Sequence, residues 1–556
     1  MKMNENIKLK ELRDFEPIGG IHGISVVFPK FQDIIDYEEQ KTRINQGYPR
    51  FVMHPYIKKI EEEYRHKYNC KDVFVFHNYN SAVFIVVDYF YRNYEKIFSN
   101  EGLQQEIYSF LENKFQMNKS TIKLNAEVLL LDAKNFKNNT KFKNKKIICL
   151  FSKNNINFNK IDNIDLIVLQ NKKYNIGIII SFKEEYQIFN LLRRHTGFIT
   201  SSRKLEGDRI LNKNNQTLCT KNVQKRISAL EKTSPNNCFL YPSGMAAIFS
   251  SIYSIISPDK PNFITLGSLY VDTIRILEKW LVKYNLNKPL FITENILDNL
   301  EKNIDHKTAG IILEIPSNPL IQIIDLEKVV NLAHEFDCKV IVDSTIASPY
   351  NINPFDFNVD IIIHSTTKFL SGKNNHIGGV LLVNNEDLQR KIKNFNKILQ
   401  LEMFSSEIEI LNENLINFEL RMKIINANSI KIAQFLDNHE AVGHVNYPLL
   451  KNNPYNHLIK KYLKGGSGLI SFILKNSTFE NAEKFYNNVA APILKGPSLG
   501  SEATLLSPYV IMAHYGDSEK KLEQLGLDKF LMRISIGTEP YDQIIDSLKQ
   551  GLNALE

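Results

Sequence analysis

The chain of 556 residues lacks several features that would identify common classes of protein. It has no CxxC pair and no histidines near a cysteine at metal-ligand spacing, so we expect reduced, mostly buried thiols and no metal site. Its five cysteines are far apart, at Cys70, Cys149, Cys219, Cys238 and Cys338. No apolar run approaches the length of a membrane span, and the opening MKMNENIKLKELRDFEP has no signal-peptide core. We therefore expect a cytoplasmic protein with no membrane partner.

Basic stripes punctuated by aromatic residues are also missing. The net charge is +8, but the lysines are interleaved with asparagines, as in KNFKNNTKFKNKK. A solvated surface accounts for this pattern better than a nucleic-acid interface, so we expect no nucleic-acid partner. Hydrophobic residues make up 43% of the chain and charged residues 23%, which is typical of a globular protein with room for several domains.

Between about residues 220 and 385, helices are predicted to alternate with buried strands. The predicted strands lie in NCFLYPSG, NFITLGS, AGIILEIPS, KVIVDST and DIIIHST, each of which ends in a polar or glycine turn. This pattern is typical of an α/β fold with a mostly parallel sheet and helices on both faces. Because ligands bind at the carboxyl ends of such strands, the polar residues there are the candidates for a site.

We predict three units: an N-terminal α/β extension (1–195), a large domain (196–430) and a smaller C-terminal α/β domain (431–556). The segments IKKIEEEYRHKYNCKDVFVFHNYNSAVF and VQKRISALEKTSPNNCFLYPSGMAAIF share an order of predicted elements. Each has an amphipathic helix, a turn, an aromatic strand, a polar turn and a helix start. A decayed duplication and two copies of a common supersecondary unit both explain this similarity.

Two charged residues lie at predicted strand ends. Lys368 follows the buried run VDIIIHS, where a partly desolvated amine loses its proton readily and can form a Schiff base with an aldehyde. A solvated lysine is the alternative. Asp343 ends the strand KVIVD, where a carboxylate needs a cationic partner such as a protonated pyridine nitrogen. A helix N-cap is the alternative for Asp343.

Groups that can bind an anion or a flat ring follow other strands. Ser243, Gly244 and Met245 lie where a strand turns into a helix, so free N–H groups and the helix dipole could hold a phosphate. A plain N-cap explains that motif equally well. Ser365 and Thr367 supply further hydroxyl donors. Tyr270 supplies an aromatic ring that can stack on a flat cofactor, with core packing as the alternative. Arg533 is suited to bind a carboxylate, with an internal salt bridge as the alternative.

Taken in order, these stretches resemble the Cys/Met-metabolism family of pyridoxal-phosphate enzymes of fold type I. The matching blocks, from about residue 235 to 550, are YPSGMAAI, EIPSNPL, VDSTIASPY, HSTTKFLSG, IGG, SLGSEATLLSP and RISIGTE. The resemblance implies pyridoxal 5'-phosphate as the cofactor, Lys368 as the lysine that binds it covalently, and Asp343 as the partner of its ring nitrogen. It implies that Asn318 contacts the phenolic oxygen and that Tyr270 stacks on the ring and assists proton transfer. The implied phosphate ligands are Ser243, Gly244, Met245, Ser365 and Thr367, and the implied carboxylate ligands are Arg533 and Ser498.

The beginning of the chain, HGISVVFPKFQDIIDYEEQKTRINQGYPRFVMHPYIKK, is similar to that of family members with a long N-terminal extension, the long-form cystathionine gamma-synthases. The family's Tyr-x-Arg pair, which a neighbouring subunit gives to the phosphate, is missing from its usual place before SGM. Tyr48 and Arg50 are our candidates for this pair, and Arg203 is the rival. Two other blocks depart from the family pattern, LNENLINFELRM and EAT, and these departures bear on substrate specificity.

The resemblance implies a γ-replacement in which an O-acylhomoserine and cysteine give cystathionine. A gamma-lyase and an O-acylhomoserine sulfhydrylase are the alternatives within the family, and a catalytically silent cofactor-binding scaffold is the alternative outside it. Pro497 precedes Ser498 and offers no charge that would recognise an amino-acid acceptor. A homodimer or homotetramer with the site at a subunit interface is also implied.

Overall fold

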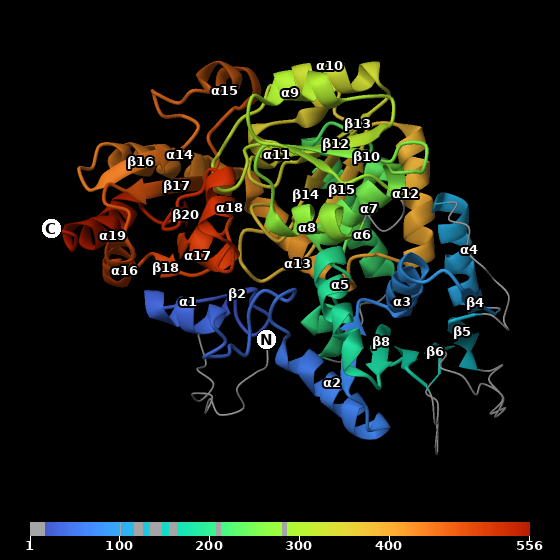
Figure 1. Ribbon diagram of the computed structural model, residues 1–556. Coiled ribbons are helices and arrows are strands. Elements are labelled where there is room, and N and C mark those ends of the chain that lie inside the picture. The colour runs from blue at the N-terminus through green and yellow to red at the C-terminus, as the bar shows by residue number, and fades with distance from the viewer. Residues whose placement is uncertain are drawn as a thin grey trace.

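The structure is a computed structural model that describes residues 17–100, 102–115, 126–133, 147–154, 164–206, 213–280 and 286–556. The opening segment that we judged not to be a signal peptide lies outside these residues up to position 16, as does the Lys/Asn-rich segment 134–146. The described chain forms three large sheets and one short two-stranded sheet (Figure 1). The short sheet pairs β1 (Pro17–Ile18) with β2 (Ser25–Val26).

The central sheet has seven strands in the order β11-β10-β12-β13-β14-β15-β9. Neighbouring strands from β11 to β14 are parallel, whereas β15 is antiparallel to both β14 and β9. All five strands predicted in this region are present, so the mostly parallel sheet is confirmed. The strands are β9 (Cys238–Tyr241), β10 (Asn262–Leu266), β11 (Leu290–Ile292), β12 (Thr308–Glu314), β13 (Lys339–Asp343), β14 (Ile361–His364) and β15 (Gly379–Val383).

Helices cover both faces of this sheet. Along β13, Ile341 joins one apolar cluster, whereas its neighbours Val340 and Val342 join another, as alternating side chains must. Burial on both faces explains why these strands are continuously apolar. The helices around the sheet are α6 (Lys213–Leu230), α7 (Gly244–Ile255), α8 (Val271–Lys279), α9 (Ile296–Asn303), α10 (Leu326–Glu335), α11 (Ser348–Asn351), α12 (Glu386–Leu399) and α13 (Ser405–Asn414).

A five-stranded sheet in the order β16-β17-β20-β19-β18 forms the C-terminal part. The long helix α14 (Phe418–Asp437) links it to the central sheet: Met422 packs in the central core and Ile432 in the C-terminal core. The division that we propose at residue 430 therefore falls inside a helix. The remaining elements are β16 (Val442–Asn446), β17 (Leu469–Leu474), β18 (Leu494–Lys495), β19 (Leu505–Pro508), β20 (Met532–Ser535), α15 (Asn456–Tyr462), α16 (Phe479–Asn488), α17 (Tyr509–Ala513), α18 (Glu519–Gln524) and α19 (Tyr541–Asn553).

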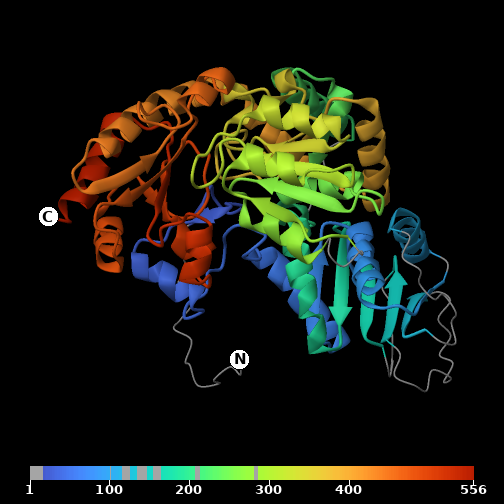
Figure 2. The ribbon, with the colours of Figure 1, turned by 45° about the horizontal axis from the view of Figure 1, so that its top comes forward.

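The N-terminal part contributes to two places in the fold. Its first helix, α1 (Phe31–Glu38), packs on the C-terminal core, where the Phe31 ring meets Tyr486 edge-on. The rest forms a six-stranded sheet in the order β3-β8-β7-β6-β5-β4, which lies beneath the central sheet in Figures 1 and 2. Its elements are α2 (Pro55–Tyr68), β3 (Asp72–Phe76), α3 (Tyr79–Asn93), β4 (Ile97–Ser99), α4 (Leu103–Phe115), β5 (Val128–Asp132), β6 (Ile147–Ser152), β7 (Leu166–Asn171), β8 (Ile176–Ser181) and α5 (Ile188–Thr196).

None of the described helices is long and apolar enough to cross a membrane. Across the same residues, no group of three or more His, Cys, Asp or Glu side chains is placed to hold a metal ion. The five cysteines are free thiols, and three of them, Cys149, Cys238 and Cys338, are buried, as predicted.

Candidate active site

A cavity of about 680 Å³ lies where three distant parts of the chain meet. Glu314 and Asp343 reach it from the carboxyl ends of β12 and β13, and Lys368 from the loop after β14. Arg50 enters from the N-terminal part and Arg533 from β20 of the C-terminal part. This is the strand edge where parallel α/β sheets bind ligands.

Lys368 lies in the wall of this cavity with its amine turned to polar and aromatic neighbours. Its Nζ donates a hydrogen bond of 2.9 Å to Ser498 Oγ and lies 4.8 Å from the centre of the Tyr48 ring. Burial, together with the positive charges of Arg533 and Arg50, lowers the pKa of Lys368 from 10.5 to about 7. At neutral pH a large fraction of this amine is unprotonated and nucleophilic.

Two carboxyl groups face each other at the strand ends. Glu314 and Asp343 are paired in the β12–β13 ladder, so their side chains leave the same face of the sheet. Burial and the nearby charge of Asp343 raise the pKa of Glu314 well above its ordinary value. Burial also raises the pKa of Asp343, although hydrogen bonds from Thr345 act in the opposite direction. A cation placed beside the pair relieves the repulsion, which is what a protonated ring nitrogen does.

The start of α7 and the loop after β14 form an anion-binding corner. Gly244 and Met245 line the cavity at the first turn of α7, where helix N–H groups lack intrahelical partners. Ser365 faces them, because a Cβ on Gly244 would lie 3.2 Å from Ser365 Oγ. That buried hydroxyl has no hydrogen-bond partner in the described structure.

Two of the predicted phosphate ligands have other partners. Ser243 accepts a hydrogen bond from Ala246 N and donates one to Gly197 O, so its hydroxyl caps α7. The Thr367 hydroxyl is held by the backbone of Gly378. Neither side chain is part of the cavity wall. Their part in phosphate binding stays a prediction.

Arg50 closes the corner from the N-terminal part. It is buried, forms a 3.0 Å ion pair with Asp272 and donates to the Tyr270 hydroxyl. Arg194 and Arg275 also pair with Asp272, so three guanidinium groups around one carboxylate leave a net charge of +2. Burial raises the pKa of Asp272, but the charges of Arg50 and Arg194 outweigh it and lower the pKa to about 2.

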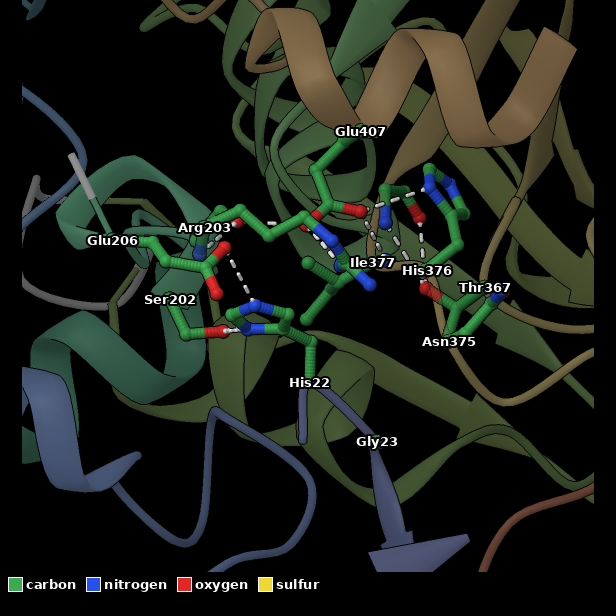
Figure 3. A network of polar contacts seen from close by, with 12 residues as sticks. His22, Gly23, Ser202, Arg203, Glu206, Thr367, Asn375, His376, Ile377 and Glu407 are labelled. Atoms are coloured by element: carbon green, nitrogen blue, oxygen red, sulfur yellow. Dashed lines mark hydrogen bonds and ion pairs between the residues drawn. The ribbon is translucent and has the colours of Figure 1, made fainter. Parts of the chain in front are cut away.

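Arg203, the rival of Arg50, lies elsewhere. Its guanidinium binds Glu407 at 2.9 Å, and Glu407 also binds His376 and the backbone of Ile377 (Figure 3). Arg203 is not in the wall of the cavity, whereas Tyr48 and Arg50 both are.

Arg533 comes from β20 of the C-terminal part and is buried. It donates to Asn318 Oδ1 at 3.2 Å and to the Ser498 backbone carbonyl at 3.0 Å, and its guanidinium lies 4.8 Å from the Tyr509 ring centre. Its buried Nε has no hydrogen-bond partner among the described residues. A planar carboxylate would satisfy that N–H.

Comparison with known proteins agrees with this geometry. Cystathionine gamma-synthase of Neurospora crassa is 33% identical over 61% of this chain, which matches only 55% of that protein. An L-methionine gamma-lyase of Fusobacterium nucleatum is 31% identical, over 60% of this chain and 83% of the relative. Cystathionine beta-lyase of Lactococcus lactis is 29% identical, over 56% of this chain and 81% of the relative.

Solved structures match the same region. Cystathionine gamma-lyase of Lactobacillus plantarum, complexed with L-serine, has a TM-score of 0.56 at 29% identity, over 61% of this chain and 88% of that chain. A structure described as an O-acetylhomoserine (thiol)-lyase of Campylobacter jejuni has a TM-score of 0.56 at 28% identity, over 60% of this chain and 86% of its own, and contains a pyridoxyl-lysine phosphate. The fold is therefore that of fold type I pyridoxal-phosphate enzymes. The family of Cys/Met metabolism PLP-dependent enzymes matches residues 200–553, and the chain belongs to this family.

The residues present fit pyridoxal phosphate. The unpartnered Ser365 hydroxyl, the first turn of α7 and the excess positive charge beside Arg50 suit a phosphate dianion. The Lys368 amine suits an aldehyde, and the carboxyl pair suits a protonated ring nitrogen. These are separate chemical requirements, and one cavity meets all of them.

Sequence reasoning missed several residues of the site. Glu314 could have been found because it ends the buried strand AGIILE, next to the strand that ends in Asp343. Asp272 follows Tyr270 closely in LGSLYVDT, but its three arginine partners are visible only in the fold. Glu38 and Tyr509, which also line the cavity, carry no motif that would single them out.

Proposed function

We propose that this enzyme catalyses γ-replacement on an O-acylhomoserine, with cysteine as the acceptor and cystathionine as the product. The observation that carries the proposal is one cavity that combines a lysine of lowered pKa with a buried arginine for a carboxylate. The relative with 33% identity, a cystathionine gamma-synthase, favours replacement, whereas other relatives are lyases.

Each side chain has a separate task. When bound, pyridoxal phosphate supplies an electron sink that stabilises negative charge on the substrate carbons. Ser365, Gly244, Met245 and Arg50 hold its phosphate, and Asp343 holds its ring nitrogen. Arg533 orients the substrate carboxylate with its free Nε–H. The Lys368 amine, a large fraction of which is unprotonated at neutral pH, takes the α-proton and returns it, and Ser498 keeps the amine in place between these transfers.

The acceptor needs a partner for its ammonium group, and Glu38 supplies a carboxylate in the cavity wall. Glu38 belongs to α1 and lines the same cavity as Pro497. Pro497 carries no charge, whereas Glu38 has a carboxyl group that can distinguish an amino-acid acceptor from sulfide. Burial raises the pKa of Glu38 to about 7, with Arg194 acting in the opposite direction. An incoming ammonium would favour the ionised carboxylate. We therefore expect the N-terminal part of the chain to recognise the acceptor.

The test incubates the loaded enzyme with O-succinylhomoserine or O-acetylhomoserine, with and without cysteine, and identifies products by mass spectrometry. We expect cystathionine only when cysteine is present, and none from Lys368→Ala. The variant Glu38→Gln should raise KM for cysteine at least fivefold and change KM for the donor less than twofold.

Other products point to the alternatives. If 2-oxobutyrate forms at the same rate with and without cysteine, the enzyme is a lyase. Homocysteine formed from sulfide in preference to cystathionine identifies a sulfhydrylase. A bound cofactor without turnover of either donor supports the silent scaffold. A cytoplasmic location and a homodimer or homotetramer of whole chains stay predictions.

A further inference from the structure

The six strands of the N-terminal sheet repeat six of the seven strands of the central sheet, all except β11. Reading from one edge, β3-β8-β7-β6-β5-β4 corresponds to β9-β15-β14-β13-β12-β10. In both sheets the first two pairings are antiparallel and the next three are parallel. A common supersecondary unit of one helix, one strand and one helix does not account for six strands in the same order and directions.

The register of the strands agrees as well. Gly177 of β8 pairs with Phe76 of β3, and Gly379 of β15 pairs with Tyr241 of β9, so β3 and β9 correspond at an offset of 165 positions. The same offset aligns the helix N-caps Asn78 and Ser243, and each of these side chains accepts a hydrogen bond from the backbone N–H of the third residue of its helix.

The two glycines also meet the same obstacle. A Cβ on Gly177 would lie 2.2 Å from Asn78 O, and one on Gly379 would lie 2.4 Å from Ser243 O. Both positions therefore need glycine, because the N-cap of the helix that follows the neighbouring strand, α3 after β3 and α7 after β9, approaches closely. Such agreement in a local detail is expected of a duplicated domain.

Equivalent residues of the two copies touch each other. At the offset of 165, Phe84 of α3 corresponds to Phe249 of α7, and their rings lie 6.1 Å apart. Asp88 corresponds to Tyr253, and the Tyr253 hydroxyl donates to Asp88 Oδ1 at 3.4 Å. Residues meet their own counterparts only on a two-fold axis, as in a symmetric dimer.

Helix contacts across the same interface are reciprocal. Helix α3 packs against α12 of the other copy, and α7 packs against α5, which follows β8 as α12 follows β15. Residues of both copies share one apolar cluster, including Phe84 and Phe249. The interface is thus of the kind that joins the subunits of a tight dimer, within a single chain.

Of the two copies, only the second has the lysine and the aspartate of the active site, whereas Asp132 of β5 takes the ladder position of Glu314. The position of Asp343 in the ladder is taken by Phe151, and that of Gly244 by Tyr79. Four residues, 172–175, join β7 to β8, where the second copy has fourteen, 365–378, that include Lys368. The first copy therefore has no counterpart of the lysine or of the aspartate.

The segments that precede each copy are exchanged. Arg50, just before the first copy, reaches the cavity of the second, where it binds Tyr270 and Asp272. Lys204, just before the second copy, donates to the His77 carbonyl of the first at 2.8 Å, and Leu205 packs in the core of the first copy. Each copy thus receives its neighbour's leading segment.

We propose that residues 55–196 are a cofactor-free copy of the cofactor-binding domain that takes the place of a partner subunit. The chain is a fused pseudo-dimer with one active site, and Arg50 completes that site from within the same chain. The proposal concerns cofactor binding and does not depend on which reaction the enzyme catalyses.

The test co-expresses two differently tagged full-length variants, Arg50→Ala and Lys368→Ala, and measures the Kd of pyridoxal phosphate by visible absorbance and borohydride trapping on Lys368. Arg50→Ala alone should weaken the cofactor at least tenfold, Arg50→Lys should recover part of that loss, and Arg203→Ala should leave the Kd within threefold of wild type. In the mixture, Lys368-containing chains should bind as weakly as Arg50→Ala alone.

A population of wild-type affinity that appears only in the mixture would show that Arg50 acts in trans and would overturn the proposal. Wild-type affinity in Arg50→Ala alone would overturn the role of Arg50. Should Arg50→Ala fold poorly, the same comparison with Arg50→Lys and Lys368→Ala gives the answer. All of these readouts are independent of product formation, so a failure of the proposed γ-replacement would be seen separately.

Discussion

In the cofactor-free protein, replacing Lys368 by methionine should increase stability. The pKa of Lys368 is about 7 in the folded protein and 10.5 for an ordinary lysine, a difference of 3.5. At about 1.4 kcal/mol for each pH unit, holding this amine in the cavity costs about 4 kcal/mol at pH 7. Water in the cavity screens part of this cost, so we expect a gain of about 2–4 kcal/mol from Lys368→Met.

The sign of the pH dependence follows from proton binding. Between pH 7 and 10.5 the folded state binds fewer protons at Lys368 than the unfolded state does, so stability rises with pH across this window. The cost of Lys368 is therefore largest at and below pH 7 and is lost above pH 10.5. At pH 10 the advantage of Lys368→Met should have fallen below about 1 kcal/mol.

The assay is urea unfolding of cofactor-free wild type and variant at pH 7 and pH 10, with circular dichroism as the probe. Lys475, which is exposed, provides a matched control: Lys475→Met should change stability by less than about 0.5 kcal/mol at either pH. A Lys368→Met protein no more stable than wild type at pH 7, or an advantage that does not change with pH, would refute the reasoning.

Two further substitutions test the cavity. Asp343→Asn should lower kcat about 100-fold while borohydride still traps the cofactor on Lys368, because the carboxylate keeps the ring nitrogen protonated; an unchanged kcat would contradict this role. Arg533→Lys should raise the donor's KM roughly 10- to 100-fold with kcat within threefold of wild type, since an ammonium cannot replace the planar fork. A KM unchanged in steady-state kinetics would mean that Arg533 does not bind the substrate carboxylate.

Much of the fold follows from local pattern. Each of the five predicted strands in the central sheet combines a short apolar run with a polar or glycine end, and this length and ending favour a strand that is buried on both faces. The strands β11 and β15 were not predicted. β11 has only three residues, Leu290–Ile292, and GVLLV in β15 follows directly on the glycines of the preceding loop.

Part of the cavity could also be predicted from local pattern. Lys368 and Asp343 come from neighbouring strand ends, and the carboxyl ends of parallel strands meet at one edge of a sheet. Arg50 and Tyr270 are separated by 220 positions, and no local pattern predicts that they touch. The charge balance around Asp272 depends on such long-range contacts and was missed.

The duplication of the N-terminal copy could be recognised from the sequence only in part. Its sequence similarity to the second copy was visible over one helix, one strand and the start of the next helix, where caps and aromatic residues keep their positions. Beyond Phe84 and its counterpart Phe249, the strands agree mainly in their apolar character, which many sequences share, and in isolated positions such as Gly177 and Gly379. Pairing and register, which only the fold reveals, carry the evidence for duplication.

The most direct test of the account is to reduce the loaded enzyme with borohydride, digest it and locate the pyridoxyl group by mass spectrometry, with the cofactor counted per chain. The account predicts one pyridoxyl group per chain, on Lys368, and none on Lys172 or Lys173 in the corresponding loop of the N-terminal copy. A label in that loop, two groups per chain, or a trapped cofactor in Lys368→Ala would contradict it.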